Sequence, residues 1–110
     1  MSDTTVSLIG WIFAHLSFLL PMKRIGQNRF WLAYRHPRPV YRTHYLLVPK
    51  GAYARLSECP FDQADFSEAF FSLVNSVIIE KKLAQQECKL ILNAGKFQTF
   101  PVAHAHLIVE

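Results

Sequence analysis

Two histidines near the end of the sequence stand two residues apart, at positions 104 and 106. Successive side chains of a β-strand point to opposite faces, so a strand over Val102–Val109 places His104 and His106 side by side on one face. The apolar residues that alternate with them then cover the other face. An imidazole buried without a partner is costly. A pair of histidines on one strand face therefore predicts a functional site.

Such a pair is compatible with two kinds of chemistry. A His-x-His spacing can place two imidazoles on one metal ion, with His44 on another strand as a third ligand. The spacing His104-x-His106-x-x-x-Glu110 also echoes the metal motif of cupin barrels. A cupin needs many short strands and a second metal motif, which this sequence lacks, so we predict neither a metal site nor a cofactor. The other chemistry is nucleophilic attack of an imidazole on phosphorus.

The residues around the pair favour the second chemistry. The segment 93–108 resembles the signature of the histidine-triad (HIT) superfamily, in which an Asn-x-Gly, a short loop and a Gln-Ser or Gln-Thr pair precede histidines that alternate with apolar residues. Upstream, the segment 39–50 (PVYRTHYLLVPK) is similar to the same family's Pro-x-x-x-x-His-x-Leu strand, which ends in Pro-Lys. The two segments occur in the family's order, with a long helical segment between them. The chain is identified on these motifs as a HIT-like protein.

The resemblance implies a role for each matched residue. His104 matches the central histidine, which attacks the α-phosphorus and forms a covalent nucleotidyl-histidine that water hydrolyses. His106 matches the third histidine, which stabilises the phosphate and protonates the leaving group. Four further positions match groups that bind or support the phosphate: Asn93, Gln98, Thr99 and His44. The implied function is that of a nucleotide hydrolase or nucleotidyl transferase, with a nucleotide or another phosphorylated small molecule as its partner.

The sequence departs from the family pattern at two positions. The triad's first histidine is replaced, which leaves a degenerate triad, Val102-x-His104-x-His106. The acidic residue that holds the ribose hydroxyls in the family aligns with His36, and an imidazole has at most one acceptor for them. An alternative function therefore stays open, that of a non-catalytic HIT-like module that binds a phosphorylated ligand or RNA.

The charge distribution is compatible with either function. No acidic residue occurs between Thr4 and Ser57, whereas eight of the twelve basic residues lie there. An acid-free basic half is typical of proteins that bind phosphate groups or nucleic acid. Aromatic residues alternate with these arginines, as base-stacking surfaces require and as strands also prefer.

The elements that must position these residues form an α+β pattern in a single domain, residues 1–110, as expected for a chain of this length. We predict a five-stranded antiparallel sheet, as the resemblance implies, with an N-terminal helix and one long helix. The long helix is expected to begin with an Asp62 or Asp65 cap and to bury Ala69, Leu73 and Val77. The predicted elements are strands at Met22–Ile25, Arg29–Arg35, Thr43–Val48, Lys89–Leu92 and Val102–Val109, a turn at Gly26–Asn28, and the long helix at Phe61–Leu83.

The apolar run Leu8–Leu20 is too short to cross the hydrocarbon core of a membrane, so we predict a helix that packs on the domain rather than a membrane span. Cys59 and Cys88 form no C-x-x-C motif, which indicates reduced thiols and a cytoplasmic location. HIT-like proteins are commonly dimers, so the resemblance implies a homodimer.

Overall fold

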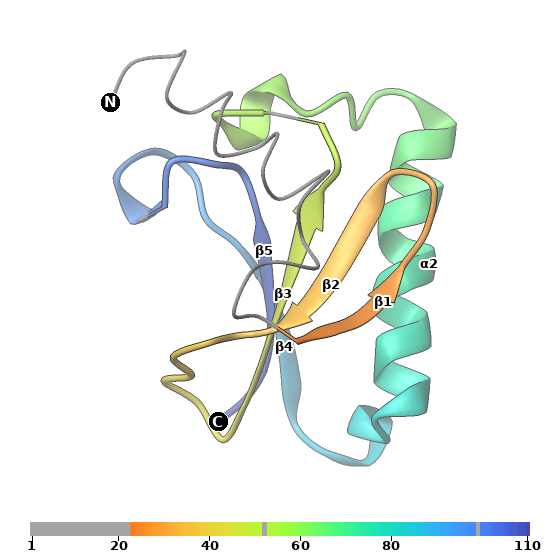
Figure 1. Ribbon diagram of the computed structural model, residues 1–110, viewed down its shortest axis with the longest axis vertical. Helices are drawn as coiled ribbons and strands as arrows, with labels where there is room; N and C mark the ends of the chain where they lie inside the picture. Colours follow the sequence, from red (N-terminus) through yellow and green to blue (C-terminus); the bar gives the residue numbers. More distant parts are fainter. Residues whose placement is uncertain (1–22, 52, 99) are drawn as a thin grey trace.

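The computed structural model describes residues 23–51, 53–98 and 100–110 and shows one antiparallel sheet with a helix against it (Figure 1). The strand order across the sheet is β1-β2-β3-β5-β4. The α+β class and the five-stranded antiparallel sheet predicted from the sequence are confirmed. The predicted N-terminal helix lies outside the described residues. The strands are β1 Arg24–Gln27, β2 Trp31–Arg35, β3 Thr43–Pro49, β4 Cys88–Leu92 and β5 Ala105–Val109.

The hairpin of β1 and β2 turns later along the chain than predicted, because Asn28 makes the corner. Its side-chain Oδ1 accepts hydrogen bonds from the amides of Phe30 and Trp31 at 3.1 and 3.0 Å, and its Nδ2 donates to the carbonyl of Ala69 at 2.7 Å. Gly26 lies inside β1 rather than in the turn. A Cβ at this position would come within 3.2 Å of Leu73 Cδ1, so Gly26 allows the helix to approach the strand closely.

The long helix, α2, spans Ala64–Glu80 and is shorter at both ends than predicted. Its N-cap residue is Gln63, which makes no capping side-chain hydrogen bond, so the predicted Asp62 or Asp65 cap is wrong. Asp65 instead lies in the first turn, and its carboxylate accepts a hydrogen bond from the amide of Phe66 at 2.9 Å. At the other end, Lys82 adopts a left-handed conformation with φ 58°, which stops the helix. Single turns of 3-10 helix occur at η2 Leu56–Glu58, η3 Leu83–Gln85 and η4 Gly95–Phe97.

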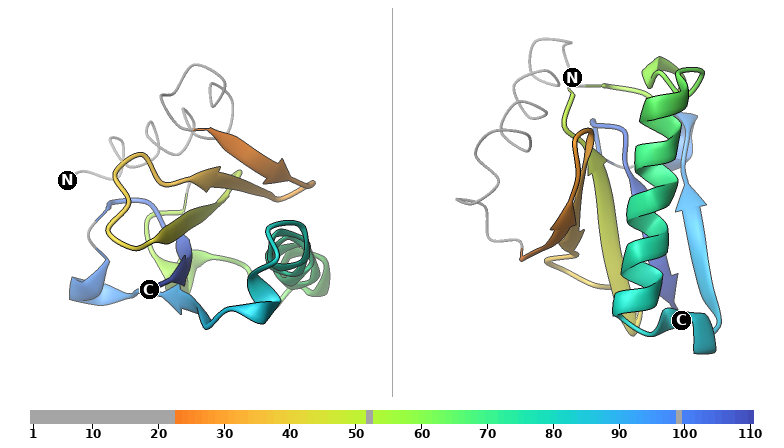
Figure 2. Two further views of the ribbon diagram at one scale, coloured as in Figure 1. Left: turned by 90° about the horizontal axis from the view of Figure 1, so that it is seen from below. Right: turned by 90° about the vertical axis from the view of Figure 1, so that its right-hand side faces the viewer.

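The core lies between α2 and one face of the sheet (Figure 2). Trp31 of β2 packs against Phe66 and Phe70 of α2, with ring centroids 5.2 and 4.6 Å apart. Three alternate residues of β5 and Ala103, two residues before the strand, pack in this core, as the predicted alternation requires: Ala103, Ala105, Leu107 and Val109. The strand itself begins at Ala105 rather than at Val102, so Val102–His104 lies in the segment before β5.

The opposite face of the sheet carries a smaller apolar cluster made of Leu32, Tyr34, Val48 and Val102. The candidate histidines lie on this face as well, because Leu46 of β3 is opposite His106 in the β3–β5 register. No helix in the described part of the chain is long and apolar enough to cross a membrane.

Candidate active site

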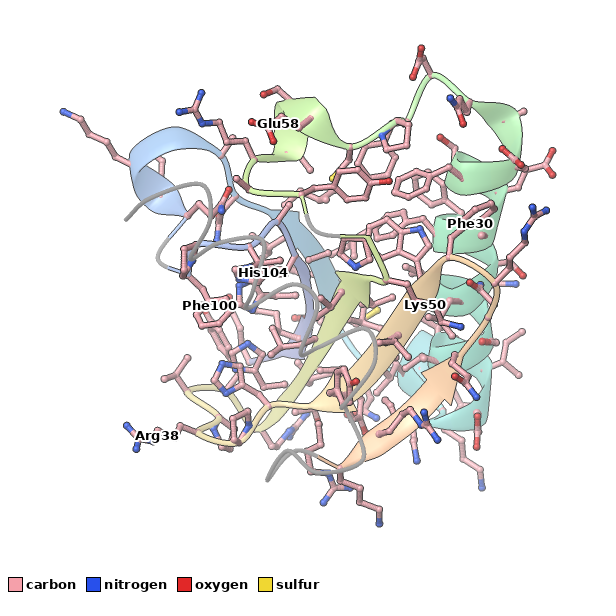
Figure 3. All side chains as sticks on the ribbon, turned by 45° about the horizontal axis from the view of Figure 1, so that its top comes forward. Phe30, Arg38, Lys50, Glu58, Phe100 and His104 are labelled. Carbon is pink, nitrogen blue, oxygen red and sulfur yellow. The ribbon has the colours of Figure 1, made fainter. Side chains whose placement is uncertain are left out.

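Three histidines from neighbouring strands meet on the face of the sheet away from α2. His44 lies on β3 and is only 5% exposed, His106 lies on β5, and His104 lies immediately before β5. Figure 3 shows His104 beside Phe100 on this side of the molecule. The two rings are in edge contact, with centroids 6.2 Å apart. The pairing of β3 with β5 therefore brings His44 together with His106 and His104.

The three imidazoles form a continuous hydrogen-bonded chain. His104 Nε2 lies 3.1 Å from His106 Nε2, and His106 Nδ1 lies 2.8 Å from His44 Nε2. The ring at each end of this imidazole chain forms a hydrogen bond with a backbone group. At one end His104 Nδ1 lies 2.8 Å from the carbonyl oxygen of Val102, and at the other the amide of Val40 donates to His44 Nδ1 at 3.4 Å.

These two backbone groups determine where each neutral imidazole carries its proton. A carbonyl oxygen can only accept, so His104 Nδ1 carries hydrogen and His104 Nε2 has a free lone pair. His106 Nε2 must then donate to that lone pair, which leaves His106 Nδ1 as an acceptor. His44 Nε2 therefore donates to His106, and His44 Nδ1 accepts from the Val40 amide. All the donors and acceptors match, with one proton on each ring.

The environment favours the neutral forms that this assignment requires. Burial, followed by the charge of neighbouring histidines, lowers the pKa of both His44 and His106 to about 4. Burial and the proximity of His104 also lower the pKa of His36. At neutral pH the rings of His36, His44 and His106 are therefore uncharged.

The lowered pKa values predict that the fold loses stability in mild acid. Unfolded histidines titrate near pH 6.5, so below pH 7 the unfolded chain takes up protons that folded His44 and His106 do not bind until about pH 4. The free energy of unfolding should fall by about 2 kcal/mol between pH 7 and pH 5, less than the full shifts imply because His106 is partly exposed and screened. Urea unfolding at the two pH values measures this difference, and carboxylates titrate little in that range. An equal midpoint at pH 5 and pH 7 would contradict the neutral assignment, whereas His106→Asn should make the dependence shallower.

The loop between β4 and β5 holds the other predicted phosphate-binding positions. Asn93 is half-buried directly after β4, and Thr99 lies outside the described residues. Gln98 Nε2 donates to the carbonyls of Ala54 and Phe100 at 2.8 and 2.9 Å, so both of its amide hydrogens hold the loop. Donation from Gln98 to a phosphate would require the release of one carbonyl. Within the same loop Gly95 has φ 60°, a left-handed conformation that glycine adopts without strain.

The structure adds His36 to the cluster, a residue that the sequence singled out only as a departure from the family pattern. Its ring stacks on His44, with centroids 4.2 Å apart and an angle of 25° between the planes. Strand pairing was the signal that could have found it, because Arg35 pairs with Tyr45 and the next residue on each side is a histidine. Tyr41 contacts the same His44 ring edge-on at 5.2 Å.

The arrangement does not suit a shared metal ion. The two nitrogens of His106 face different partners, His104 and His44, rather than converging with them on one point. No group of three potential ligands in the described ranges is placed to hold a metal.

Val102, which replaces the first histidine of the triad, is fully buried in the apolar cluster with Leu32, Tyr34 and Val48.

Comparison with known proteins shows the fold and the family to which the chain belongs. The structure is similar to that of a histidine triad protein from Clostridium difficile, with a TM-score of 0.77 and 25% identity over 90% of this chain and 89% of that one. HIT family hydrolases from Clostridium thermocellum (TM-score 0.77, 23% identity, 94% and 90% covered) and Legionella pneumophila (0.74, 21%, 86% and 86%) share the fold. No curated protein sequence matches significantly. Residues 19–109, most of the chain, match the HIT domain family, and the chain belongs to that family.

Proposed function

We propose that the protein is a HIT-type nucleotide hydrolase or nucleotidyl transferase that acts at the α-phosphate through a nucleotidyl-histidine on His104. The observation that carries the proposal is the hydrogen bond from His104 Nδ1 to the Val102 carbonyl. It leaves His104 Nε2 unprotonated and directed at the donor hydrogen of His106. A nucleophile and a proton donor at this distance are the two groups that substitution at phosphorus needs.

The first half-reaction follows from the proton positions. The lone pair of His104 Nε2 forms a bond to phosphorus, and the bond from phosphorus to the leaving group breaks with its electron pair. The leaving group takes its proton from solvent water while His106 Nε2–H donates a hydrogen bond to it, so His106 stays a neutral imidazole. The positive charge that develops on the His104 ring is stabilised by the Val102 carbonyl on its Nδ1–H.

The second half-reaction restores the starting state. Water attacks the phosphorus, the N–P bond breaks, and its electron pair returns to His104 Nε2. The proton that the attacking water loses passes to solvent, and His106 keeps its hydrogen on Nε2. In a transferase another hydroxyl or phosphate replaces the water. Throughout, His106 Nδ1 continues to accept the hydrogen of His44 Nε2, which keeps the ring in place.

The remaining assignments belong to the same proposal. Asn93, Gln98 and Thr99 bind the phosphate, His44 supports this site through His106, and the substrate is a nucleotide or another phosphorylated small molecule. A homodimer, which sedimentation velocity would detect, and a cytoplasmic location complete the proposal.

A second candidate, a non-catalytic module for a phosphorylated ligand or RNA, is favoured by one observation. Val102 is built into an apolar cluster, so the family's first histidine has been replaced by a core side chain. Such a module would bind oligonucleotides in a salt-sensitive manner without turnover.

Trapping the covalent intermediate tests the choice between the two. Incubation with adenosine 5′-phosphoramidate, rapid acid-free quenching and mass spectrometry should reveal an adenylylated chain. His106→Ala should lower turnover by about a hundredfold, because losing one hydrogen-bond donor to the charge that develops in the transition state typically costs about that much, and should still form the adduct. Phe71→Ala, on the outer face of α2, is the matched control and should behave as wild type. No adduct and no turnover in any variant, together with oligonucleotide binding, would favour the module.

A further inference from the structure

In the loop that leads from β2 to β3, residues with a backbone amide hydrogen alternate with prolines over residues 36–40. Pro37 and Pro39 have no amide hydrogen, so this segment contains only three backbone donors. Arg38 marks the outer end of the loop in Figure 3. The three donors are the amides of His36, Arg38 and Val40.

All three amides donate a hydrogen bond to an atom of a histidine. The His36 amide donates to the carbonyl of His44 at 2.9 Å, and the Arg38 amide donates to Nδ1 of His36 at 3.0 Å. The Val40 amide donates to Nδ1 of His44 at 3.4 Å. The His36 ring also stacks on the His44 ring, 4.2 Å away. The loop is thus shaped around two imidazoles, and its third amide reaches one end of the active-site chain.

We propose that residues 36–40 form a tautomer lock for the active site, in which His36 is a positioning residue that holds the loop so that the Val40 amide keeps the His44 proton on Nε2. The inference rests on the proposed function, because its consequence is the protonation state of His106. His44 Nε2–H forces His106 to carry its own hydrogen on Nε2, facing His104 and the leaving group. The substrate is then attacked by a ring that already has its proton donor beside it.

The alternative tautomer shows what the lock prevents. Without the Val40 amide, His44 can carry its hydrogen on Nδ1, and His106 then donates from its own Nδ1 to His44 Nε2. The Nε2 atoms of His104 and His106, 3.1 Å apart, would face each other with two lone pairs and no hydrogen. In that state His106 has no proton for the leaving group. The nucleophile would be intact, and the hydrogen-bond donor to the leaving group would be absent.

A proline at position 40 removes the one hydrogen on which the lock depends. Val40 is 77% exposed, so its side chain contributes little packing, and Val40→Ala is a matched control that keeps the amide. We expect Val40→Pro to lower kcat by about ten- to a hundredfold, the usual effect of losing a contact that orients a ligating or reacting imidazole, with KM unchanged. Val40→Ala should retain the wild-type kcat.

A second pair of variants tests the role of His36. His36→Ala removes the stacked ring and the acceptor for the Arg38 amide. His36→Asn restores an acceptor two residues before that amide, as in an Asx turn. We expect kcat to fall in His36→Ala and to recover in part in His36→Asn.

Nitrogen-15 NMR of histidine-labelled protein reads the tautomers directly, without substrate. Wild type and Val40→Ala should show His44 and His106 as Nε2–H and His104 as Nδ1–H. Val40→Pro and His36→Ala should show mixed tautomers at His44 and His106, with the fold verified by circular dichroism. Wild-type tautomers in both variants would overturn the lock, as would Nδ1–H at His44 in the wild type. Because this measurement needs no turnover, it separates failure of the lock from failure of the proposed reaction.

Discussion

Replacing His104 with alanine is expected to reduce the turnover of adenosine 5′-phosphoramidate by at least about a thousandfold, because the remaining groups can only position and polarise the substrate. His104 Nε2 is unprotonated, because the Nδ1–H of the same ring donates to the Val102 carbonyl. The covalent adduct should disappear together with turnover. This distinguishes His104→Ala from His106→Ala, in which the adduct still forms.

The measurement is kcat/KM for the two alanine variants and the wild type, side by side. Circular dichroism controls for folding, since His104 is partly exposed and its removal should leave the core intact. Wild-type turnover by His104→Ala would show that another group attacks the phosphorus. Turnover that persists with an adduct on His106 would reverse the two roles.

The largest effect on stability is expected at Phe70, which is 1% exposed between the sheet and the helix. Its ring contacts Trp31 at 4.6 Å and Phe61 at 5.6 Å. Phe70→Ala removes these contacts and leaves a cavity, which typically costs about 3–5 kcal/mol. A domain of this size has a total stability of about 5–15 kcal/mol, so the variant should be largely unfolded at moderately raised temperature.

The next residue along the helix provides the control. Phe71 is 58% exposed, so Phe71→Ala removes a ring of the same size from a position that stays mostly in water. Its loss should cost less than about 1 kcal/mol. Urea unfolding of the two variants compares them directly. Equal midpoints would mean that the packing of α2 on the sheet does not depend on Phe70.

Period-two alternation made the sheet and most of the site predictable from sequence. The apolar residues between the histidines of Val102–Val109 had to point to one face, and they pack under α2. The family motifs singled out His44, and the structure places it on β3, which pairs with β5. These features depend on the spacing of residues within a strand, and this spacing can be counted directly in the sequence.

Features that depend on tertiary contacts were harder to predict from the sequence. The start of α2 was misplaced because Asp65 satisfies the next amide within the first turn instead of capping the helix. The turn between β1 and β2 was misplaced because Gly26 serves the approach of Leu73 rather than a reversal of the chain. The stacking of His36 on His44 depends on the strand register together with the loop conformation. Neither can be predicted from the local secondary-structure propensity of the residues.

Both ends of the imidazole chain are held by main-chain atoms, at Val40 and Val102, whose side chains have no part in the contact. A carbonyl or amide is present whatever side chain the residue carries, except that proline lacks the amide hydrogen. Mutations can therefore change the side chain at position 102 during evolution without breaking the bond that orients the nucleophile. The replacement of the first triad histidine by valine is a substitution of this kind: the ring has gone while the oxygen that the neighbouring imidazole uses has stayed. Selection on this site would therefore conserve the backbone conformation at these two positions rather than the identity of their side chains.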